Sequence, residues 1–352
     1  MNNCDMLSVT APPRVVPMTP FLNQLKPWVT VICTSYNHES YVEDALRSVV
    51  AQTYPNVELI VIDNASTDHT AERIRAFCAQ HPAVTFIQQR TNIGLCRAFN
   101  EGLRRAGGTY IIDLAADDVL LPDRIARQVE LFERLPADYG VVFGNAAYIG
   151  EAGQLLGYHY PVDASGRTRL NIPSGWVFRQ ILSSYFICTP TMMMRRSVLD
   201  ELGGYDESLS FEDFDFWVRS ARRYRYAYQD AVLTHKRRLS TSMAMQVLRP
   251  DNPLLESTLV VCYKAFDQCA TPDEYDALAG RISGFIRKAF YAEQFDLALR
   301  FGKLLRYIRR PDFLTESVLL LSRLRLPVNR LYQHLRRRQH RRNEVTLNPV
   351  TL

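Results

Sequence analysis

The chain has 352 residues, of which 47% are hydrophobic and 22% charged, enough for one large globular domain or a domain with an appendage. Its net charge of +5 is unevenly placed, because residues 300–342 hold thirteen Lys and Arg against two acidic residues. That segment carries a net charge of +11, and the rest of the chain sums to −6. This uneven distribution of charge argues against a nucleic-acid-binding protein and indicates one basic tail.

The cysteines and the N-terminus indicate the compartment. Seven cysteines form no CxxC pair and make an odd number, which predicts a reducing cytosol with neither a disulfide framework nor a zinc site. Residues 1–26 contain prolines and no sustained apolar run, so we expect a poorly ordered arm rather than a signal peptide. No stretch reaches the ~18 uncharged apolar residues that a membrane span needs.

The first half alternates strands and helices. Residues 29–33, 57–62, 84–87 and 110–114 form short apolar runs typical of buried strands, with helical patterns between them. We expect Ser40 and Glu43 to form a capping box at the first helix, followed by a core face. That face would consist of Val42, Ala45, Leu46, Val49 and Val50. The alternation predicts an α/β fold with a doubly wound, mostly parallel sheet. Neither a GxGxxG nor a Walker motif follows the first strand, which argues against a dinucleotide-binding domain.

In the second half of the chain, strand-like segments are followed by a run of predicted helices. Residues 141–149, 190–195 and 224–235 read as strands, and a loop rich in Gly and Tyr spans 150–175. From about 254 we expect helices near 254–269, 273–291, 293–309 and 313–325. We therefore divide the chain into an arm (1–26), an α/β sheet domain (27–245), a helical C-terminal region (246–335) and a basic tail (336–352).

The stretch YIIDLAADDVLLPDR places two carboxylates, Asp117 and Asp118, at the end of a strand. Ligands of open α/β sheets bind at the carboxyl ends of strands, and adjacent acids there are costly unless paired or metal-bound. Such oxygen ligands suit Mg²⁺ or Mn²⁺ beside substrate phosphates. Pro122 suits the first turn of the next helix. The alternative is a solvated turn acid before a helix cap.

Five motifs together resemble family 2 glycosyltransferases with the GT-A fold, in particular those that build bacterial surface polysaccharides. They are VICTSYNHE, VIDNASTD, RTNIGLCRAFNEGL, LAADDVLLPDRI and LGGYDESLSFEDFDFWVR, which follow one another in family order between residues 29 and 242. The resemblance implies a GT-A-like sheet followed by a helical region.

The resemblance also implies which residues surround a nucleotide-sugar donor. These are Ser35, Tyr36, Glu39, Asp63, Asn92, Gly94, Arg97 and Asp117. Asp63 would accept the N3–H of uracil or thymine, and the alternative is a cap on the turn after the strand. Arg97 could instead be an ordinary surface residue of a helix.

The family's metal motif, LDxDD, is incomplete here because Ala115 replaces its first acid. The resemblance implies Asp117 and Asp118 as ligands of Mg²⁺ or Mn²⁺, with phosphates and waters completing the shell. His235 is a third candidate metal ligand, with a structural histidine as the alternative. His235, Lys236 and Arg237 could otherwise contact phosphates.

The acids of FEDFDFW supply the candidate base. The family's ED motif implies Asp213 as the catalytic base and Glu212 as a residue that binds the acceptor or positions the loop. Asp215 would only cap or orient. The alternative is that all three acids favour a helix N-terminus through its dipole.

The C-terminal region combines an apolar helix, FLTESVLLLSRLRL, with arginines at 336–338 and 341–342. This combination suits an anionic membrane surface, and the alternative is a packed helix with a solubilising tail. No motif there supports nucleic-acid binding.

These observations predict an inverting glycosyltransferase of hexosyltransferase type that uses a UDP- or dTDP-linked donor. A glycan or lipid-linked hydroxyl would be the acceptor, in cell-surface glycan synthesis, in the cytoplasm or at the inner face of the plasma membrane. One alternative is a catalytically inactive glycosyltransferase-like binding protein, which Ala115 favours. Another is a sugar nucleotidyltransferase, although SYNHES is not the glycine-rich basic loop that such an enzyme needs.

Overall fold

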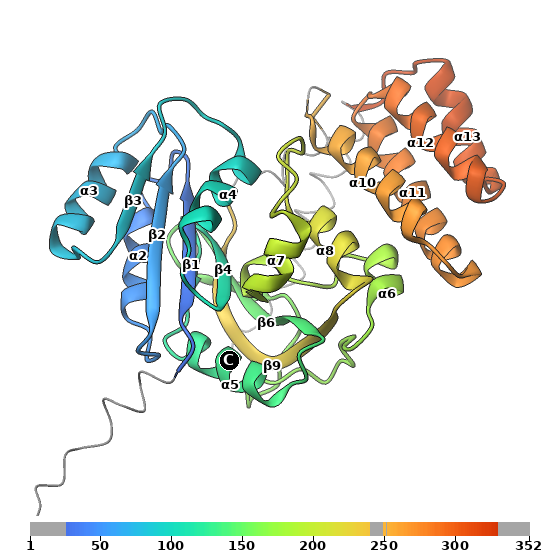
Figure 1. Cartoon of the computed structure of the whole chain (residues 1–352). Helices are drawn as coiled ribbons and strands as arrows, with labels where there is room; N and C mark the ends of the chain where they lie inside the picture. The colour runs from blue at the N-terminus through green and yellow to red at the C-terminus, as the bar shows by residue number, and fades with distance from the viewer. Residues whose placement is uncertain (1–25, 240–248, 251, 330–352) are drawn as a thin grey trace, which may run out of the picture.

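The computed structural model describes residues 26–239, 249–250 and 252–329. Its centre is a nine-stranded mixed sheet with the strand order β3-β2-β1-β4-β8-β6-β9-β5 and with β7 beside β6 (Figure 1). The first four strands are parallel: β1 (Val29–Ser35), β2 (Val57–Asp63), β3 (Thr85–Gln88) and β4 (Tyr110–Ala115). Their carboxyl ends therefore meet at one edge, as the sequence predicts.

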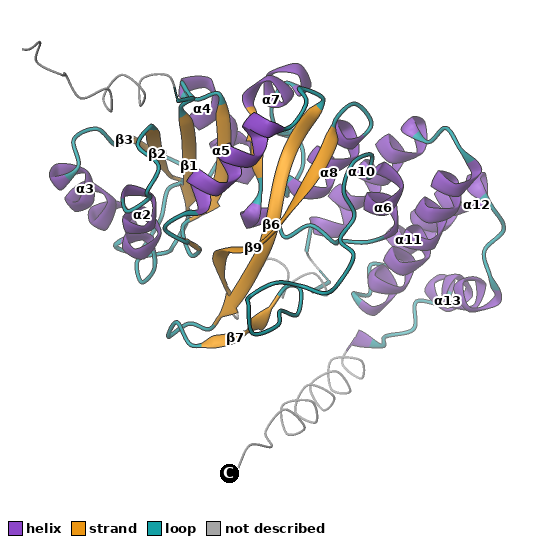
Figure 2. Cartoon of the chain, turned by 90° about the horizontal axis from the view of Figure 1, so that it is seen from below, coloured by secondary structure: helices purple, strands orange, loops and turns teal. Residues whose placement is uncertain are grey.

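The second half of the sheet brings distant segments to that edge. Its strands are β5 (Val119–Leu120), β6 (Tyr139–Ile149), β7 (Leu155–Tyr158), β8 (Met193–Arg195) and β9 (Arg225–Arg237). β8 runs antiparallel between β4 and β6, and β6 pairs in parallel with β9. β5 pairs with the end of β9, so that Val119 lies opposite His235 beside the acidic pair. Figure 2 shows β6 and β9 crossing the middle of the molecule with β7 at one end.

Helices cover both faces of the sheet, which confirms the doubly wound arrangement. One face packs against α2 (Val42–Val50), α3 (Thr70–Gln80) and α5 (Arg124–Arg134). The other packs against α4 (Leu95–Arg105), α6 (Phe178–Ser183), α7 (Arg196–Leu202) and α8 (Asp213–Ala221). A short 3-10 turn, η1 (Thr189–Thr191), leads into β8.

The C-terminal helices lie within two residues of the predicted ranges. They are α10 (Leu254–Gln268), α11 (Pro272–Tyr291), α12 (Phe295–Ile308) and α13 (Phe313–Arg323). Their buried side chains belong to the same apolar cluster as those of α4, α7 and α8, so this region shares the core of the sheet domain. The proposed division into four parts stays a prediction, because residues 1–25, 240–248, 251 and 330–352 lie outside the described residues. No helix of the described part is long and apolar enough to cross a membrane.

Three local predictions are wrong. α2 begins at Val42 after Tyr41, with no side-chain cap, and Glu43 forms an ion pair with Arg47 instead of a capping box. Val50 is 46% exposed and does not belong to the core face. The segment before Pro122 pairs with β9 as a strand, so α5 begins only at Arg124.

Candidate functional site

Two loops at the carboxyl ends of β1 and β2 are tied together by hydrogen bonds. The Asn37 N–H donates to Ser66 Oγ at 2.9 Å, and the Thr67 N–H donates to Asn37 Oδ1 at 2.8 Å. The Glu39 N–H donates to Asp68 Oδ2 at 3.1 Å. Burial raises the pKa of Asp68, but hydrogen bonds from Thr70 and the Glu39 N–H outweigh it and leave that pKa lowered. The charged Asp68 thus fixes the shape of both loops.

The three predicted nucleotide contacts of the first loop have different surroundings. Ser35 is buried, and its Oγ donates to the Ile62 carbonyl at 3.1 Å. The Glu39 carboxylate accepts the His69 N–H at 2.9 Å, at the start of α3. Tyr36 is 44% exposed. Ser35 and Glu39 therefore hold the loops, and Tyr36 is the one of the three whose side chain is most open to a ligand.

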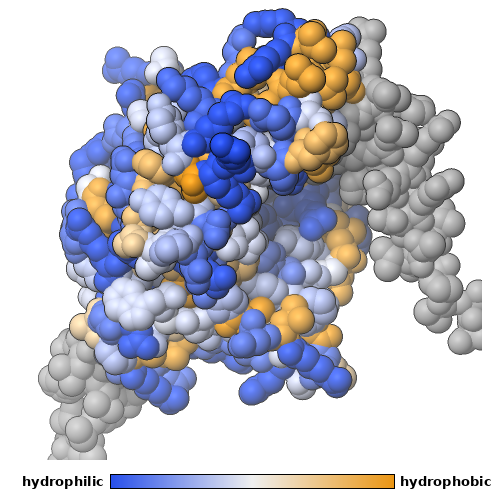
Figure 3. Space-filling view, turned by 90° about the vertical axis from the view of Figure 1, so that its right-hand side faces the viewer, coloured by the Kyte–Doolittle hydropathy of each residue, from blue (hydrophilic) through white to orange (hydrophobic). Residues whose placement is uncertain are grey.

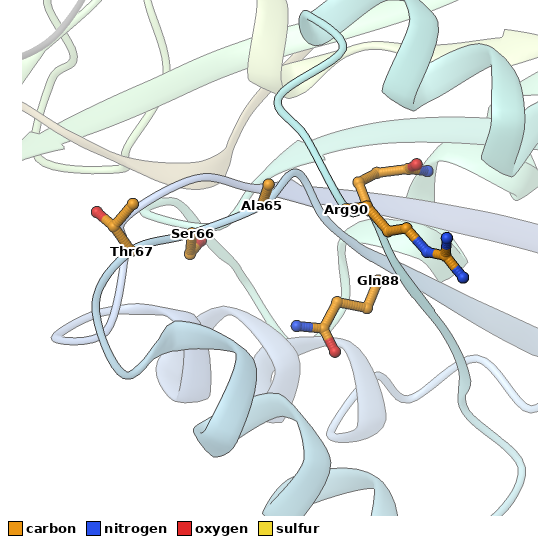
Figure 4. A pocket seen from close by; sticks show the side chains of 6 residues that line it. Ala65, Ser66, Thr67, Gln88 and Arg90 are labelled. Carbon is orange, nitrogen blue, oxygen red and sulfur yellow. The ribbon is translucent and has the colours of Figure 1, made fainter.

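A cavity of about 550 Å³ opens beside these loops, within the usual size of ligand pockets (Figure 4). Its lining consists of Ala65, Ser66, Thr67, Gln88, Gln89 and Arg90. Figure 4 shows Gln88 and Arg90 across the cavity from the turn that carries Ser66 and Thr67. Gln88, Gln89 and Arg90 were not singled out from the sequence, although the parallel alternation places the end of β3 next to that of β2.

Asp63, the predicted base contact, lies at the last position of β2 beneath this turn. It is fully buried, and its Oδ2 accepts the Ser66 N–H at 3.3 Å, as a turn cap would. Its Oδ1 is buried without a hydrogen-bond partner among the described residues. A base could reach that oxygen only if the turn moved, and Ala65 in this turn has a left-handed φ of 61°.

The third predicted loop sits at the start of α4. Asn92 Oδ1 accepts the Gly94 N–H at 3.0 Å and the Asn64 side-chain amide at 3.1 Å. Asn64 Oδ1 in turn accepts the Ile93 N–H at 2.9 Å, so Asn64, which the sequence analysis did not single out, joins β2 to α4. Gly94 has a φ of +85°, which favours glycine. The exposed Arg97 lies 3.5 Å from Glu207.

The acidic pair lies at the junction of β4, β5 and β9. Asp118 is buried, and its Oδ1 accepts the Arg237 N–H at 2.8 Å, while the Asp117 carbonyl accepts Arg237 Nε at 3.0 Å. Burial and the neighbouring Asp117 raise the pKa of Asp118 to about 8. Burial and Arg237 lower the pKa of His235, which is opposite Val119 in the strand register.

The donor set fits a divalent cation that keeps most of its shell for phosphate and water. Asp117 is half-buried, and Asp118 is buried beside it. A cation would offset the burial and the repulsion from Asp117 that together raise the pKa of Asp118. Within the described residues, no group of three or more His, Cys, Asp or Glu is placed to hold a metal ion. Asp117 and Asp118 are the two candidate ligands that lie next to each other, and the metal site that they would form with His235 stays a prediction.

A further acid, Asp113, lies two residues before Ala115 and therefore on the same face of β4. Tyr205 donates its hydroxyl to Asp113 Oδ2 at 3.1 Å, and burial nevertheless raises the pKa of Asp113 to about 7. Asn100 fixes Tyr205 by accepting its N–H at 2.9 Å and donating to its carbonyl at 2.8 Å. Gly204 permits this contact, because its φ is +76° and a Cβ there would lie 2.4 Å from Asn100 Oδ1.

The three acids of FEDFDFW have separate environments. Asp215 is 1% exposed and lies 2.7 Å from Arg219 and 2.6 Å from Lys264, so its carboxylate joins α8 to α10. Asp213 accepts the Phe214 N–H at 2.6 Å and the Thr189 hydroxyl at 3.2 Å.

Glu212 and Asp213 are neighbours, and both have a raised pKa. Burial raises the pKa of Asp213, and burial together with Asp213 and Asp113 raises that of Glu212 well above its usual range. A shifted pair of this kind is typical of acid–base sites.

The sequence matches a known family over residues 30–203, described as Glycosyl transferase family 2. The chain belongs to glycosyl transferase family 2.

An uncharacterized glycosyltransferase of Rickettsia conorii is 27% identical over 217 residues, covering 61% of this chain and 35% of that protein. One from Methanocaldococcus jannaschii is 29% identical over 209 residues, covering 57% and 67%. Escherichia coli chondroitin synthase is 29% identical over 196 residues, covering 55% and 26%. The chain thus spans about a third of the Rickettsia relative.

Solved structures confirm the GT-A fold of this family 2 glycosyltransferase. Staphylococcus aureus TarS 1–349 in complex with UDP-GlcNAc superposes with a TM-score of 0.58 at 16% identity, covering 87% of this chain and 92% of that one. The mannosyltransferase PcManGT of Pyrobaculum calidifontis, in complex with GDP-Man and Mn²⁺, gives 0.54 at 18% identity, covering 86% and 81%.

Lys236 of β9 is affected by acids of both sites. Burial lowers the pKa of Lys236, but Cys188, Asp118, Tyr148 and Asp213 outweigh it and leave that pKa raised. The ammonium makes no ion pair with any described residue. Asp118, a predicted metal ligand, and Asp213, the predicted base, thus both raise the pKa of Lys236, which directly follows the predicted ligand His235.

Proposed function

We propose that the chain is an inverting glycosyltransferase that moves a sugar from a UDP- or dTDP-linked donor to a hydroxyl acceptor. The observation that carries this proposal is the presence of two acidic sites on different elements, each held by hydrogen bonds: Asp117–Asp118 after β4, where Asp118 accepts the Arg237 N–H, and Glu212–Asp213 at the start of α8, where Asp213 accepts the Thr189 hydroxyl. An in-line displacement needs one site to stabilise the departing diphosphate and another to remove the acceptor proton.

Asp213 is the base on the attacking side. In a single displacement at the anomeric carbon, the acceptor hydroxyl loses its proton as its oxygen bonds to carbon and the bond to diphosphate breaks. The Phe214 N–H and the Thr189 hydroxyl donate hydrogen bonds to the Asp213 carboxylate and fix its orientation. Because the pKa of Asp213 is raised, it lies nearer the working pH, which favours a general base. Glu212, beside it, positions the loop or the acceptor.

The leaving side consists of Asp117, Asp118 and Lys236. A bound Mg²⁺ or Mn²⁺ would supply charge neutralisation to the departing diphosphate. Asp117 and Asp118 would hold that ion, and the Lys236 ammonium would contact a phosphate oxygen. The Mn²⁺ bound by the P. calidifontis mannosyltransferase supports a divalent cation.

The donor nucleotide would lie along the loops after β1, β2 and β3. Tyr36 is open to a base, the cavity beside Ser66 and Arg90 has a suitable volume, and Asp63 Oδ1 lacks a partner among the described residues. A uracil or thymine N3–H would satisfy that oxygen once the turn over Asp63 moved. TarS supports a uridine nucleotide, because its structures contain UDP and UDP-GlcNAc.

The acceptor is a glycan or lipid-linked hydroxyl of cell-surface glycan synthesis, and the transferred sugar is a hexose or hexose derivative. The resemblance of the sequence to chondroitin synthase supports a glycan acceptor. A screen of nucleotide sugars by release of nucleoside diphosphate, with and without Mn²⁺, tests the proposal. We expect the wild type to release the nucleoside diphosphate from a UDP- or dTDP-sugar, and Asp213→Asn to release it about 10²–10⁴-fold more slowly. Nucleotide-sugar binding without release or transfer would instead support an inactive binding protein.

A further inference from the structure

The outward side of the last described helices carries an unusually apolar surface. We call it the α13 ridge, made of Tyr307, Phe313, Leu314, Leu320, Leu324 and Leu326, all of which are exposed. Phe313 alone is 90% exposed. Figure 3 faces the helical side of the molecule and shows hydrophobic side chains gathered at its upper edge.

The spacing of the ridge explains why it is exposed. Phe313, Leu320 and Leu324 recur at intervals that place them along one side of α13. The opposite side, with Val318 and Leu319, is buried against α12, where Gly302 admits the Leu319 side chain. The helix therefore has a complete core face and a second apolar face, which marks an interaction surface.

The charges around the ridge indicate what covers it. Lys303 lies one helical turn before Tyr307, Arg310 lies between α12 and α13, Arg323 directly precedes Leu324, and none of the three has an ion-pair partner among the described residues. The sequence beyond the described part adds Arg330 and the arginines at 336–338 and 341–342. An apolar helical face with a basic border complements a negatively charged lipid surface, where the apolar side chains enter the acyl boundary.

We propose that the α13 ridge docks this glycosyltransferase on an anionic lipid bilayer. The contact is peripheral, because α13 is too short to span. Lipid docking would place the enzyme beside a lipid-linked acceptor, but it does not depend on the proposed transfer reaction.

Pelleting of the full chain with phosphatidylcholine–phosphatidylglycerol vesicles tests this proposal. The wild type should pellet at low salt and progressively less as salt rises. The double variant Phe313→Ser, Leu324→Ser should lose about tenfold in vesicle affinity per side chain. The matched control is Leu155→Ser, Leu156→Ser, which removes two exposed leucines from β7 and should leave pelleting unchanged.

Three outcomes would overturn the proposal. The first is a full chain that ignores anionic vesicles at low salt, and the second is equal binding to pure phosphatidylcholine. The third is a ridge variant that pellets like the wild type but has a smaller particle size in light scattering, which would make the ridge a contact between copies. Circular dichroism of each variant checks that the fold is intact.

A second observation concerns Arg281 on α11, in the helical region outside residues 30–203. The residue is 8% exposed, and its guanidinium donates to the Ile181 carbonyl at 2.9 Å. The Tyr185 and Phe214 rings lie 4.0 and 4.3 Å from its Cζ, so the guanidinium packs against both rings, which also contact each other. Its Nε and Nη2 have no hydrogen-bond partner among the described residues, and Phe214 directly follows Asp213.

We infer that Arg281 is a positioning residue for the Asp213 carboxylate, an inference that rests on the proposed role of Asp213 as the base. A buried cation without an ion pair is costly, and the Asp213 charge offsets that cost. Arg281 in turn lowers the pKa of Asp213 against the effect of burial. The groups that face Asp213 are Glu212 and the Phe214 N–H on α8, Thr189 on η1, Lys236 on β9, Tyr185, and Arg281.

The pH profile of kcat/KM distinguishes positioning from mere packing. Because loss of the cation disfavours ionised Asp213, Arg281→Met should move the acid limb of the profile upward by about one pH unit. Activity should recover at higher pH, and Arg281→Lys should restore most of the limb. If Arg281→Met fails to fold, the comparison of Arg281→Lys with Arg281→Gln replaces it. An unchanged limb in folded variants overturns the inference, while a fully active Asp213→Asn would overturn the proposed function instead.

Discussion

Asp215→Asn separates the structural acid of FEDFDFW from the catalytic one. In the folded protein the Asp215 carboxylate is 1% exposed and lies between Arg219 of α8 and Lys264 of α10. The substitution keeps the shape of the side chain but removes its charge, and it turns an amide toward one of the two cations. We expect lower stability with unchanged chemistry.

The magnitude follows from the two contacts of 2.7 and 2.6 Å. Hydrogen bonds to charged groups contribute about 1.5–3 kcal/mol each, and breaking a buried ion pair costs roughly 3–5 kcal/mol. Lys264 is partly exposed, so water screens part of its interaction and the lower end applies. A loss of about 3 kcal/mol lowers the melting temperature of a domain of this size by ~6 °C or more.

Thermal unfolding followed by circular dichroism measures this loss, with Asp213→Asn as the matched variant. Because the pKa of Asp213 is raised, its charged form is disfavoured in the folded state. Asp213→Asn should therefore melt at or slightly above the wild-type temperature while losing turnover. Asp215→Asn that melts like the wild type, or that loses turnover without losing stability, would refute this assignment of the two acids.

Two further predictions concern buried carboxylates. Asp63→Ala should weaken UDP or dTDP binding by about 1–3 kcal/mol in calorimetry, the cost of leaving the N3–H of the base without its acceptor, and unchanged affinity would contradict its role in base recognition. Asp113 has a pKa of about 7, above the ~3.9 of an unfolded chain, so the folded state holds an extra proton between these values and stability falls as pH rises through that window. Asp113→Asn should therefore gain on the order of 1–3 kcal/mol over the wild type at pH 8 but not at pH 4, measured by denaturant unfolding. An equal difference at both pH values would contradict the shift.

Local patterns in the sequence predicted much of the fold. The β-branched runs marked the four parallel strands, and apolar spacing located α10 to α13 within two residues. The motif after β4 led to Asp117 and Asp118, and the structure does place them at the sheet edge. The predicted capping box at Ser40 and Glu43 does not form, because Glu43 pairs with Arg47 instead. The spacing of Ser40 and Glu43 alone does not reveal that competing partner.

Contacts between residues far apart in the chain could not be predicted in this way. Asn100 and Tyr205 are separated by 105 positions, and only the fold brings their backbone and amide groups together. The same holds for Arg281, whose sequence neighbours give no sign that it lies against Phe214. For Asp63, the sequence pattern correctly predicted its position at the end of a strand. Its burial under the following turn could not be predicted, because it depends on packing.

The most direct test of the account is transfer by wild type and Asp213→Asn, assayed side by side with a UDP- or dTDP-linked donor and the true acceptor. The account predicts that the variant binds nucleotide like the wild type but transfers about 10²–10⁴-fold more slowly, the usual weight of general base catalysis. Near-normal turnover by Asp213→Asn would contradict the central claim and move the base to another carboxylate.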